Sequence, residues 1–281
     1  MALTPEQVEF RKTGIGASES AAIFGVHPYL SAIELYARKI GVAKDVVESE
    51  RLWWGSKLES SIIDRYTLES NASVTTDPEI CHFRRLSYGS PIICNLDAWN
   101  SSEGIPVEAK TVGEDAWWQS WDRGKRVPLY IQCQAQHQML VTGTQAAEIV
   151  ALGPKFTMHT FRIERDQAFT KKLERRVALF WAENVQGRKV PGWDGSASCY
   201  EGLKAVHPAG ELEGITELPE LQSAVLEYRE LDEVLKTANE RRSALKNQIF
   251  AELGDHRTAD LGDGFTVTRT KGNALKVKEA A

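Results

Sequence analysis

The chain has 281 residues, of which 42% are hydrophobic and 26% are charged. This composition is typical of a globular protein and excludes a wholly disordered or fibrous chain. A formal net charge of −5 excludes a polycation that coats nucleic acid, but it does not exclude a nuclease, whose active site is itself acidic. The length predicts one large domain, or one domain with an appendage.

No run of the sequence approaches eighteen apolar residues, so we expect no membrane span and no membrane partner. The first residues, MALTPEQVEF, lack the basic flank and apolar stretch of a secretory signal. The cysteines, at positions 81, 94, 133 and 199, include no CxxC pair. They are typical of reduced cytosolic thiols, and their scatter argues against a zinc or iron–sulfur site.

Hydrophobic periodicity predicts the elements of the main body. Helical spacing covers residues 31–41 and 52–68, and in the second of these Leu58, Ile62 and Tyr66 share one face. The segments that follow are predicted strands 79–85, 90–98 and 104–112, a helix over 128–142, strands 145–152 and 157–164, and a helix over 165–186. This order predicts an α/β fold, a mixed sheet flanked by helices, with a helical C-terminal extension.

The character of the chain changes after Tyr200. Residues 210–260 carry twelve acidic and six basic side chains, and residues 217–253 form a long charged helix with an apolar stripe. We therefore divide the chain into a domain over 1–200 and an extension over 201–281. Because an acidic helix repels duplex DNA, we expect the extension to serve assembly or packing.

The segment PVEAK carries the sharpest chemical signal. Glu108 and Lys110 lie two apart on a predicted strand, so their side chains leave the same face. The turn over 100–104 predicts a hairpin that brings Asp97 beside them. Two carboxylates suit Mg²⁺, and an ammonium can hold the attacking water, so the trio fits phosphodiester hydrolysis.

Further polar residues fall near this hairpin. Glu59, on the helix that begins at Trp53, is a third candidate ligand, and Gln134 and Gln138 share one face of the helix that follows the hairpin. An amide there could orient the amine of Lys110 or the water. Taken in isolation, the acidic residues and the lysine favour the ordinary alternative, a solvated surface pair.

Several blocks of the sequence resemble the lambda exonuclease and YqaJ-type viral recombinase family, within the PD-(D/E)xK nucleases. The blocks, in the order of that family, are RKTGIGASES, WWGSKLESSIIDRY, NLDAW with PVEAKT, YIQCQAQHQMLVTG and FRIERDQAF. They cover roughly residues 11–185, and five ordered blocks are far more specific than one motif. The resemblance therefore favours a nuclease, and it implies that the mixed α/β sheet is of the restriction-endonuclease-like kind.

The resemblance implies a role for each residue of the hairpin site. The positions that match the family's metal-binding acids are Glu59, Asp97 and Glu108, and the carbonyl of Ala109 is implied as a backbone ligand. Lys110 matches the catalytic lysine, and Gln134 matches the glutamine that supports it. The implied cofactor is Mg²⁺, for which Mn²⁺ is expected to substitute.

The resemblance also implies a site for the 5′-terminal phosphate. Arg11 matches an arginine that binds this phosphate, and Ser18, seven positions later, matches a serine that shares the task. Asn95 replaces a serine that contacts the phosphate in lambda exonuclease, and Leu96 replaces the proline of the motif. An asparagine can still donate a hydrogen bond, so we keep Asn95 as a contact.

From this resemblance we expect a metal-dependent 5′-to-3′ exonuclease that digests linear double-stranded DNA and leaves 3′ single-stranded tails for phage-type recombination. A ring-shaped homotrimer, a single-strand annealing protein as partner, and action in the cytoplasm of a bacterial host of a phage or prophage are implied as well. Two alternatives stay open. One is a structure-specific or restriction-type endonuclease of the same superfamily, and the other is a non-catalytic DNA-end-binding module that recruits an annealing protein.

The tryptophans have two readings. Trp53 and Trp54 lie on a helix with a core-facing stripe, which favours burial over a base-stacking role. Trp117, Trp118 and Trp121 follow the catalytic strand, and there the sequence favours neither reading.

Overall fold

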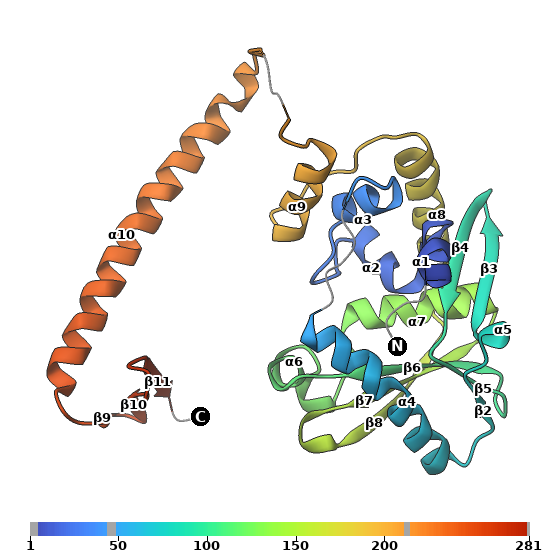
Figure 1. Ribbon diagram of the computed structural model, residues 1–281, viewed down its shortest axis with the longest axis horizontal. Coiled ribbons are helices and arrows are strands. Elements are labelled where there is room, and N and C mark those ends of the chain that lie inside the picture. The colour runs from blue at the N-terminus through green and yellow to red at the C-terminus, as the bar shows by residue number, and fades with distance from the viewer. Residues whose placement is uncertain (1–4, 44–48, 211–213, 280–281) are drawn as a thin grey trace. The chain divides into compact units, whose positions relative to one another are not determined.

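The computed structural model describes residues 5–43, 49–210 and 214–279. The chain divides after Gly210 into two compact units, Met1–Gly210 and Glu211–Ala281. Figure 1 labels the helices and strands of both. The boundary expected after residue 200 falls inside helix α9 (Ala197–Val206), which packs against α3 (Ala32–Lys39) in the first unit.

The first unit alternates helices and strands along the chain. Its other α-helices are α1 (Pro5–Lys12), α2 (Ser20–Ile23), α4 (Glu50–Ser70), α5 (Pro78–Cys81), α6 (Glu114–Gln119), α7 (Leu129–Thr142) and α8 (Gln167–Leu179). Its strands are β1 (Ile15–Gly16), β2 (Val74–Thr75), β3 (His82–Ser87), β4 (Ser90–Asn95), β5 (Ala98–Asn100), β6 (Ile105–Thr111), β7 (Ala146–Leu152) and β8 (Met158–Glu164). Shorter turns are η1 (Ala17–Glu19), η2 (Asp122–Gly124), η3 (Pro154–Phe156) and the π-helical η4 (Phe180–Gln186).

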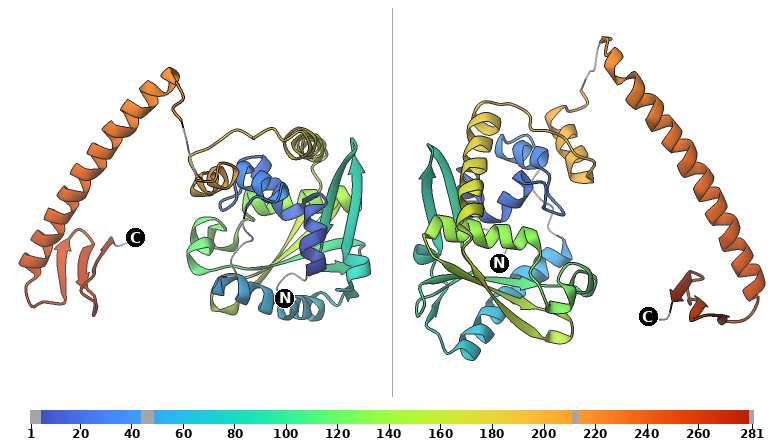
Figure 2. Two further views of the ribbon diagram at one scale, coloured as in Figure 1. Left: turned by 45° about the horizontal axis from the view of Figure 1, so that its top comes forward. Right: turned by 180° about the vertical axis from the view of Figure 1, so that it is seen from behind.

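A five-stranded sheet organises this unit, in the order β2-β5-β6-β7-β8. Strands β5 and β6 form the predicted antiparallel hairpin, β6 and β7 are parallel, and β7 and β8 are antiparallel. A second sheet has the order β1-β4-β3. The prediction of a mixed sheet flanked by helices is therefore confirmed (Figures 1 and 2).

The two faces of the five-stranded sheet are covered by different helices. Ile62, Ile63 and Tyr66 of α4 pack with Val107 and Val150 on one face. The apolar residues of α7, with those of α6, pack on the other face; the buried members of this cluster include Trp117, Ile131, Ala135, Met139, Ala147 and Ile149. Because successive strand residues alternate, Glu108 and Lys110 of β6 point away from Val107 and toward the α7 side.

The structure corrects two strand predictions. Residues 90–98 are not one strand, because the chain leaves the ladder at Leu96, whose N–H donates to the carbonyl of Cys81 at 2.9 Å. β4 and β5 thus belong to different sheets, and Asp97 lies between them. Residues 78–81 form helix α5 rather than strand, because the Asp77 carboxylate caps it and Pro78 opens it.

The tryptophans divide between core and surface. The expected burial of Trp53 and Trp54 is wrong, since they are 41% and 49% exposed. Only the later turns of α4 contact the sheet, where its buried residues begin at Ile62. Trp117 and Trp121 are buried, and Trp118 is exposed.

The second unit consists of a long helix and a small sheet. Turn η5 (Pro219–Leu221) leads into α10 (Gln222–Leu253), and β9 (Thr258–Gly262), β10 (Phe265–Arg269) and β11 (Leu275–Glu279) form an antiparallel sheet with β10 in the middle. Leu253 at the end of α10 and Val267 of β10 are buried. Within the described residues, no helix has the length and apolar character that a bilayer crossing requires.

Candidate active site

The carboxylate of Glu108 is buried at the predicted site and accepts hydrogen bonds on both of its oxygens. The Glu108 side chain is only 4% exposed. Gln134 donates from Nε2 to its Oε1 at 2.6 Å, Gln138 donates from Nε2 to its Oε2 at 2.6 Å, and Lys110 donates to Oε1. A buried carboxylate needs donors on both oxygens, and helix α7 supplies one to each.

The orientation of the Gln138 amide is fixed by Glu108. Gln138 is completely buried, and its Oε1 has no hydrogen-bond partner. Rotating the amide would satisfy nothing and would turn its oxygen toward the oxygens of Glu108. The unpaired acceptor costs about 1–3 kcal/mol, so this arrangement favours a fixed carboxylate over local stability.

Asp97 lies across the hairpin from strand β6. Its Oδ2 accepts a 2.8 Å hydrogen bond from the main-chain N–H of Ala109. Burial raises the pKa of Asp97 well above its usual value, and the nearby Glu108 and Glu59 raise it further, while Lys110 and the Ala109 N–H oppose them. The structure thus brings together Asp97, Glu108 and Lys110, as the hairpin predicted.

Glu59 joins this group from helix α4. Burial raises the pKa of Glu59, Glu108 adds to the effect, and Lys110 opposes it. Burial alone would lower the pKa of Lys110, but Glu108 and Asp97 outweigh it and raise the pKa above its ordinary value. Three carboxyl groups therefore lie near one ammonium, and their closeness and burial disfavour the ionised forms of Asp97 and Glu59.

The donor set fits a hard divalent cation. In the described stretches of the chain, no group of three or more His, Cys, Asp or Glu side chains is placed so that it could hold a metal ion. Mg²⁺ needs only one or two protein carboxylates besides waters and substrate oxygens, and an excess of carboxylate over ammonium is the charge balance it would neutralise.

A second cationic group surrounds the segment from α1 to η1. Lys39, whose side chain is 3% exposed, lies between two partners. Its Nζ donates to the carbonyl of Arg11 at 2.5 Å and pairs with Oε2 of Glu19 at 2.7 Å. The same oxygen of Glu19 accepts from the N–H of Gly16 at 2.7 Å. Arg11 and the turn that carries Ser18 are therefore tied together through Lys39.

Strand pairing places Asn95 near this turn. Gly16 pairs with Ile93 in the parallel β1–β4 ladder, so the residues after each strand run on side by side. Ser18 follows β1 by two positions, and Asn95 ends β4, two residues before Asp97. The Oδ1 of Asn95 is buried without a partner. Ser18 and Asn95 thus lie at the end of β4 that leads to Asp97.

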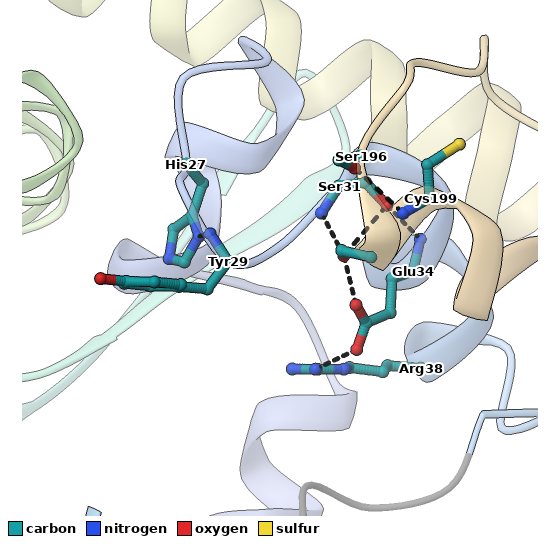
Figure 3. Close-up of polar contacts among 8 residues, drawn as sticks. His27, Tyr29, Ser31, Glu34, Arg38, Ser196 and Cys199 are labelled. Atoms are coloured by element: carbon teal, nitrogen blue, oxygen red, sulfur yellow. Dashed lines mark hydrogen bonds and ion pairs between the residues drawn. The ribbon is translucent and has the colours of Figure 1, made fainter. Parts of the chain in front are cut away.

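Helix α9 orients helix α3 through the polar network in Figure 3. The hydroxyl of Ser198 accepts from the N–H of Ser31 at 2.8 Å and donates to the carboxylate of Glu34, which also accepts from Arg38.

The pKa of His27 reflects the charged groups around it. Burial lowers this pKa, as do Arg38 and Lys110, while Glu34 opposes them. His27 therefore lies within electrostatic reach of both Arg38 and Lys110.

The sequence predicted that an amide on this helix face, from Gln134 or Gln138, could orient Lys110 or the water. It did not predict that Gln138 bonds to Glu108, and it did not single out Lys39. Gln138 gave a usable signal, because its four-residue spacing from Gln134 puts both amides on one helix face. Lys39 gave none, because a lysine in the last turn of a helix is ordinarily a solvated residue that favours the helix dipole. Only the packing of α3 against the turn after β1 buries it.

Comparison with known proteins identifies a family and a fold for the chain. Residues 6–145 match the YqaJ-like viral recombinase domain. The chain is 25% identical over 259 residues to the uncharacterized protein YqaJ of Bacillus subtilis (strain 168), covering 90% of this chain and 79% of that protein.

Among solved structures, the alkaline exonuclease LHK-Exo from Laribacter hongkongensis is similar, with a TM-score of 0.54, 21% identity, and coverage of 73% of this chain and 100% of that one. The structure of LHK-Exo in complex with dAMP gives a TM-score of 0.53 and 22% identity over the same shares of the two chains. The chain thus has the alkaline exonuclease fold and, through residues 6–145, belongs to the YqaJ-like viral recombinase family.

Proposed function

We propose that this protein is a Mg²⁺-dependent exonuclease that digests linear double-stranded DNA from its 5′ ends and leaves 3′ single-stranded tails for recombination by strand annealing. The observation that carries the proposal is the clamp on Glu108. Two buried glutamines fix both oxygens of the Glu108 carboxylate, beside Asp97 and Lys110. Burying a carboxylate costs free energy, and a Glu–Lys pair with only a structural role would not need it, so the arrangement favours a functional site. The family membership supports the same reaction class.

Asp97, Glu108, Glu59 and the carbonyl of Ala109 would hold the metal. When bound, Mg²⁺ polarises the phosphoryl group and lowers the pKa of its water. Lys110 remains an ammonium beside two carboxylates, and in this form its Nζ orients the attacking water and offsets charge on the phosphate. Gln134 and Gln138 keep the carboxylate of Glu108 in place, and the fixed carboxylate in turn positions the ammonium of Lys110. Mn²⁺, which accepts similar oxygen ligands, is expected to substitute.

Arg11, Ser18 and Asn95 are proposed to bind the 5′-terminal phosphate. A guanidinium fork matches the geometry of a phosphate, and a hydroxyl and an amide add neutral donors. The connection of Arg11 and the Ser18 turn through Lys39, and the register of β1 on β4, support a shared site near Asp97. A terminal phosphate bound there gives the enzyme its end specificity.

Double-stranded DNA ends are thus the proposed substrate. LHK-Exo is known in complex with dAMP, a mononucleotide of the kind that stepwise hydrolysis of a strand releases. A ring-shaped homotrimer that encloses the duplex, and a single-strand annealing protein that receives the 3′ tail, belong to the same proposal.

The test uses an end-labelled linear duplex and a covalently closed circle, each with Mg²⁺ and with EDTA. We expect metal-dependent loss of nucleotides from 5′ ends of the linear duplex, an intact circle, and no hydrolysis by Lys110→Ala although it still binds ends. Cutting of the circle would identify an endonuclease instead. End binding without cutting of either DNA would identify a module that delivers an annealing protein.

A further inference from the structure

Helix α10 exposes an apolar seam along most of its length. The seam positions, which alternate steps of three and four residues, are Leu221, Ala224, Tyr228, Leu231, Leu235, Ala238, Arg242, Leu245 and Ile249. Apart from Arg242 they are apolar, and they continue for four heptads. This spacing is the pattern of a coiled-coil interface rather than of a helix on a sheet.

The larger seam residues are not covered within their own unit. The exposed fractions of Leu221, Tyr228, Leu231, Leu235 and Leu245 run from 40% for Leu245 to 66% for Tyr228, and Ile249 near the end of the helix is half-buried. The small sheet contacts only the end of the helix, where Phe250 lies 5.8 Å from the guanidinium of Arg269 and Leu253 is buried. A single exposed helix with such a seam is stabilised chiefly by a partner that packs on it.

The charge along α10 identifies the partner. Residues 220–232 carry four acidic side chains and one basic, whereas residues 234–246 carry four basic and one acidic. Two copies of this helix placed antiparallel bring each acidic segment against a basic one. Two parallel copies would bring like against like, with Glu227 beside Asp232 and Arg241 beside Lys246 of the other copy.

The seam also sets the register of the antiparallel pair. Layering the seam positions against each other puts Leu231 opposite Leu235 and Tyr228 opposite Ala238 of the second copy, which alternates large and small side chains. In this register the flanking residue Glu227 faces Arg241, twice by symmetry. Asp232 lies nearest the twofold axis and meets its own counterpart, the one like-charge contact beside the seam.

We infer that α10 is a self-association surface through which two copies of this chain pair as an antiparallel coiled coil. The second copy contributes the complementary charge and covers the seam. This inference does not rest on the proposed nuclease activity, because no residue of the nuclease site takes part.

Light-scattering mass measurement of the full chain tests the surface. Leu235→Asp in the seam is expected to halve the mass, either from a dimer to a monomer or from two joined copies of the proposed trimer to one trimer. Leu226→Asp, the same change on the opposite side of the helix, is expected to leave the mass unchanged. Glu227→Arg alone and Arg241→Glu alone are expected to weaken the dimer at least tenfold, and the double variant to restore it. Asp232→Asn is expected to strengthen it. An unchanged mass for Leu235→Asp overturns the inference.

Disulfide trapping tests the direction. The native cysteines are all buried, so introduced ones do not compete with exposed thiols. The variants Glu227→Cys and Arg241→Cys are mixed and then oxidised. We expect most disulfides to join one Glu227→Cys chain to one Arg241→Cys chain. Disulfides mainly between two Glu227→Cys chains would show parallel helices and overturn the inference. No disulfide, together with a mass of the unmodified chain that Leu235→Asp does not change, would overturn it in favour of packing within one chain.

Discussion

Gln138 donates a 2.6 Å hydrogen bond from helix α7 to Oε2 of Glu108 on strand β6, the oxygen that neither Gln134 nor Lys110 reaches. Glu108 therefore cannot rotate without losing a buried donor. This contact makes α7 a support for strand β6, and the effect of removing it can be measured.

Gln138→Leu is expected to lower kcat by about 10- to 100-fold, as the loss of a residue that orients a metal ligand usually does. Single-turnover DNA hydrolysis at saturating Mg²⁺ measures this. Gln136→Leu is the matched control, because Gln136 is buried on the same helix but bonds to the carbonyl of Glu164 and the N–H of Asp166. The control should lower thermal stability while the activity per folded molecule is unchanged; equal losses in both variants would contradict the assignment.

Asp97→Asn should separate metal binding from stability. The folded pKa of Asp97 is raised by burial and by Glu108 and Glu59. The folded form then holds its proton more tightly than the unfolded form, so the carboxyl's contribution to stability is lost as pH rises above its ordinary value. At pH 8 without metal, Asp97→Asn should therefore raise Tm by about 2–4 °C.

Added Mg²⁺ should raise the Tm of the unchanged protein and leave that of Asp97→Asn nearly constant, because a ligand stabilises only the state that binds it. Differential scanning fluorimetry with Mg²⁺ and with EDTA makes the comparison. An equal rise in both proteins would remove Asp97 from the metal site.

Arg11→Ala should impair the recognition of a 5′-phosphate. Loss of a charge-assisted hydrogen bond of about 1.5–3 kcal/mol predicts an approximately 10- to 100-fold slower start on 5′-phosphorylated ends. Ends with a 5′-hydroxyl should be digested at nearly the original rate. Lys12→Ala, which alters the neighbouring exposed cation, should keep the preference for phosphate. A variant at Arg11 that slows both kinds of end equally would indicate a general role.

His137 should make the fold sensitive to acid. Burial lowers its pKa from 6.5 to about 4, although the ring lies 3.1 Å from the carbonyl of Ile93. Between these values the unfolded form binds more protons, so stability is complete above pH 6.5 and is lost as pH falls toward 4, by on the order of 3 kcal/mol.

Denaturant unfolding at half-unit steps from pH 7 to pH 4 measures this loss. His137→Gln should flatten the pH dependence, and His82→Gln, a change on the exposed side of β3, should not. A slope that survives the loss of His137 would assign it to the carboxylates instead.

Trp53 and Trp54 should bind DNA ends without supporting the fold. They are exposed, their rings meet edge to face at 4.9 Å, and Lys57 lies 5.4 Å from the ring of Trp53. Stacking of a base on an aromatic ring is worth about 1–3 kcal/mol, so Trp54→Ala should weaken end binding about 5- to 150-fold while Tm changes little. Leu68→Ala, exposed on the same helix, is the control. A large fall in Tm for Trp54→Ala would indicate a packing role.

The sequence by itself determined the local features of this protein. Alternation in PVEAK and the turn at 100–104 predicted the hairpin that brings Asp97 beside Glu108 and Lys110, because strand periodicity and turn chemistry act over a few residues. Helical spacing likewise predicted α7, and with it the shared face of Gln134 and Gln138. The order of these helices and strands along the chain predicted the α/β fold class.

Tertiary structure alone decided which surfaces meet. It divided residues 90–98 between two sheets, buried Lys39 between Arg11 and Glu19, and left Trp53 on the surface of a helix whose later turns are covered. Each of these depends on contacts between segments far apart in the chain, and neither periodicity nor capping encodes such contacts. Gln138 depends on both the local sequence and the tertiary structure. The sequence predicted which helix face it occupies, whereas its hydrogen bond to Glu108 forms only when α7 packs on the sheet.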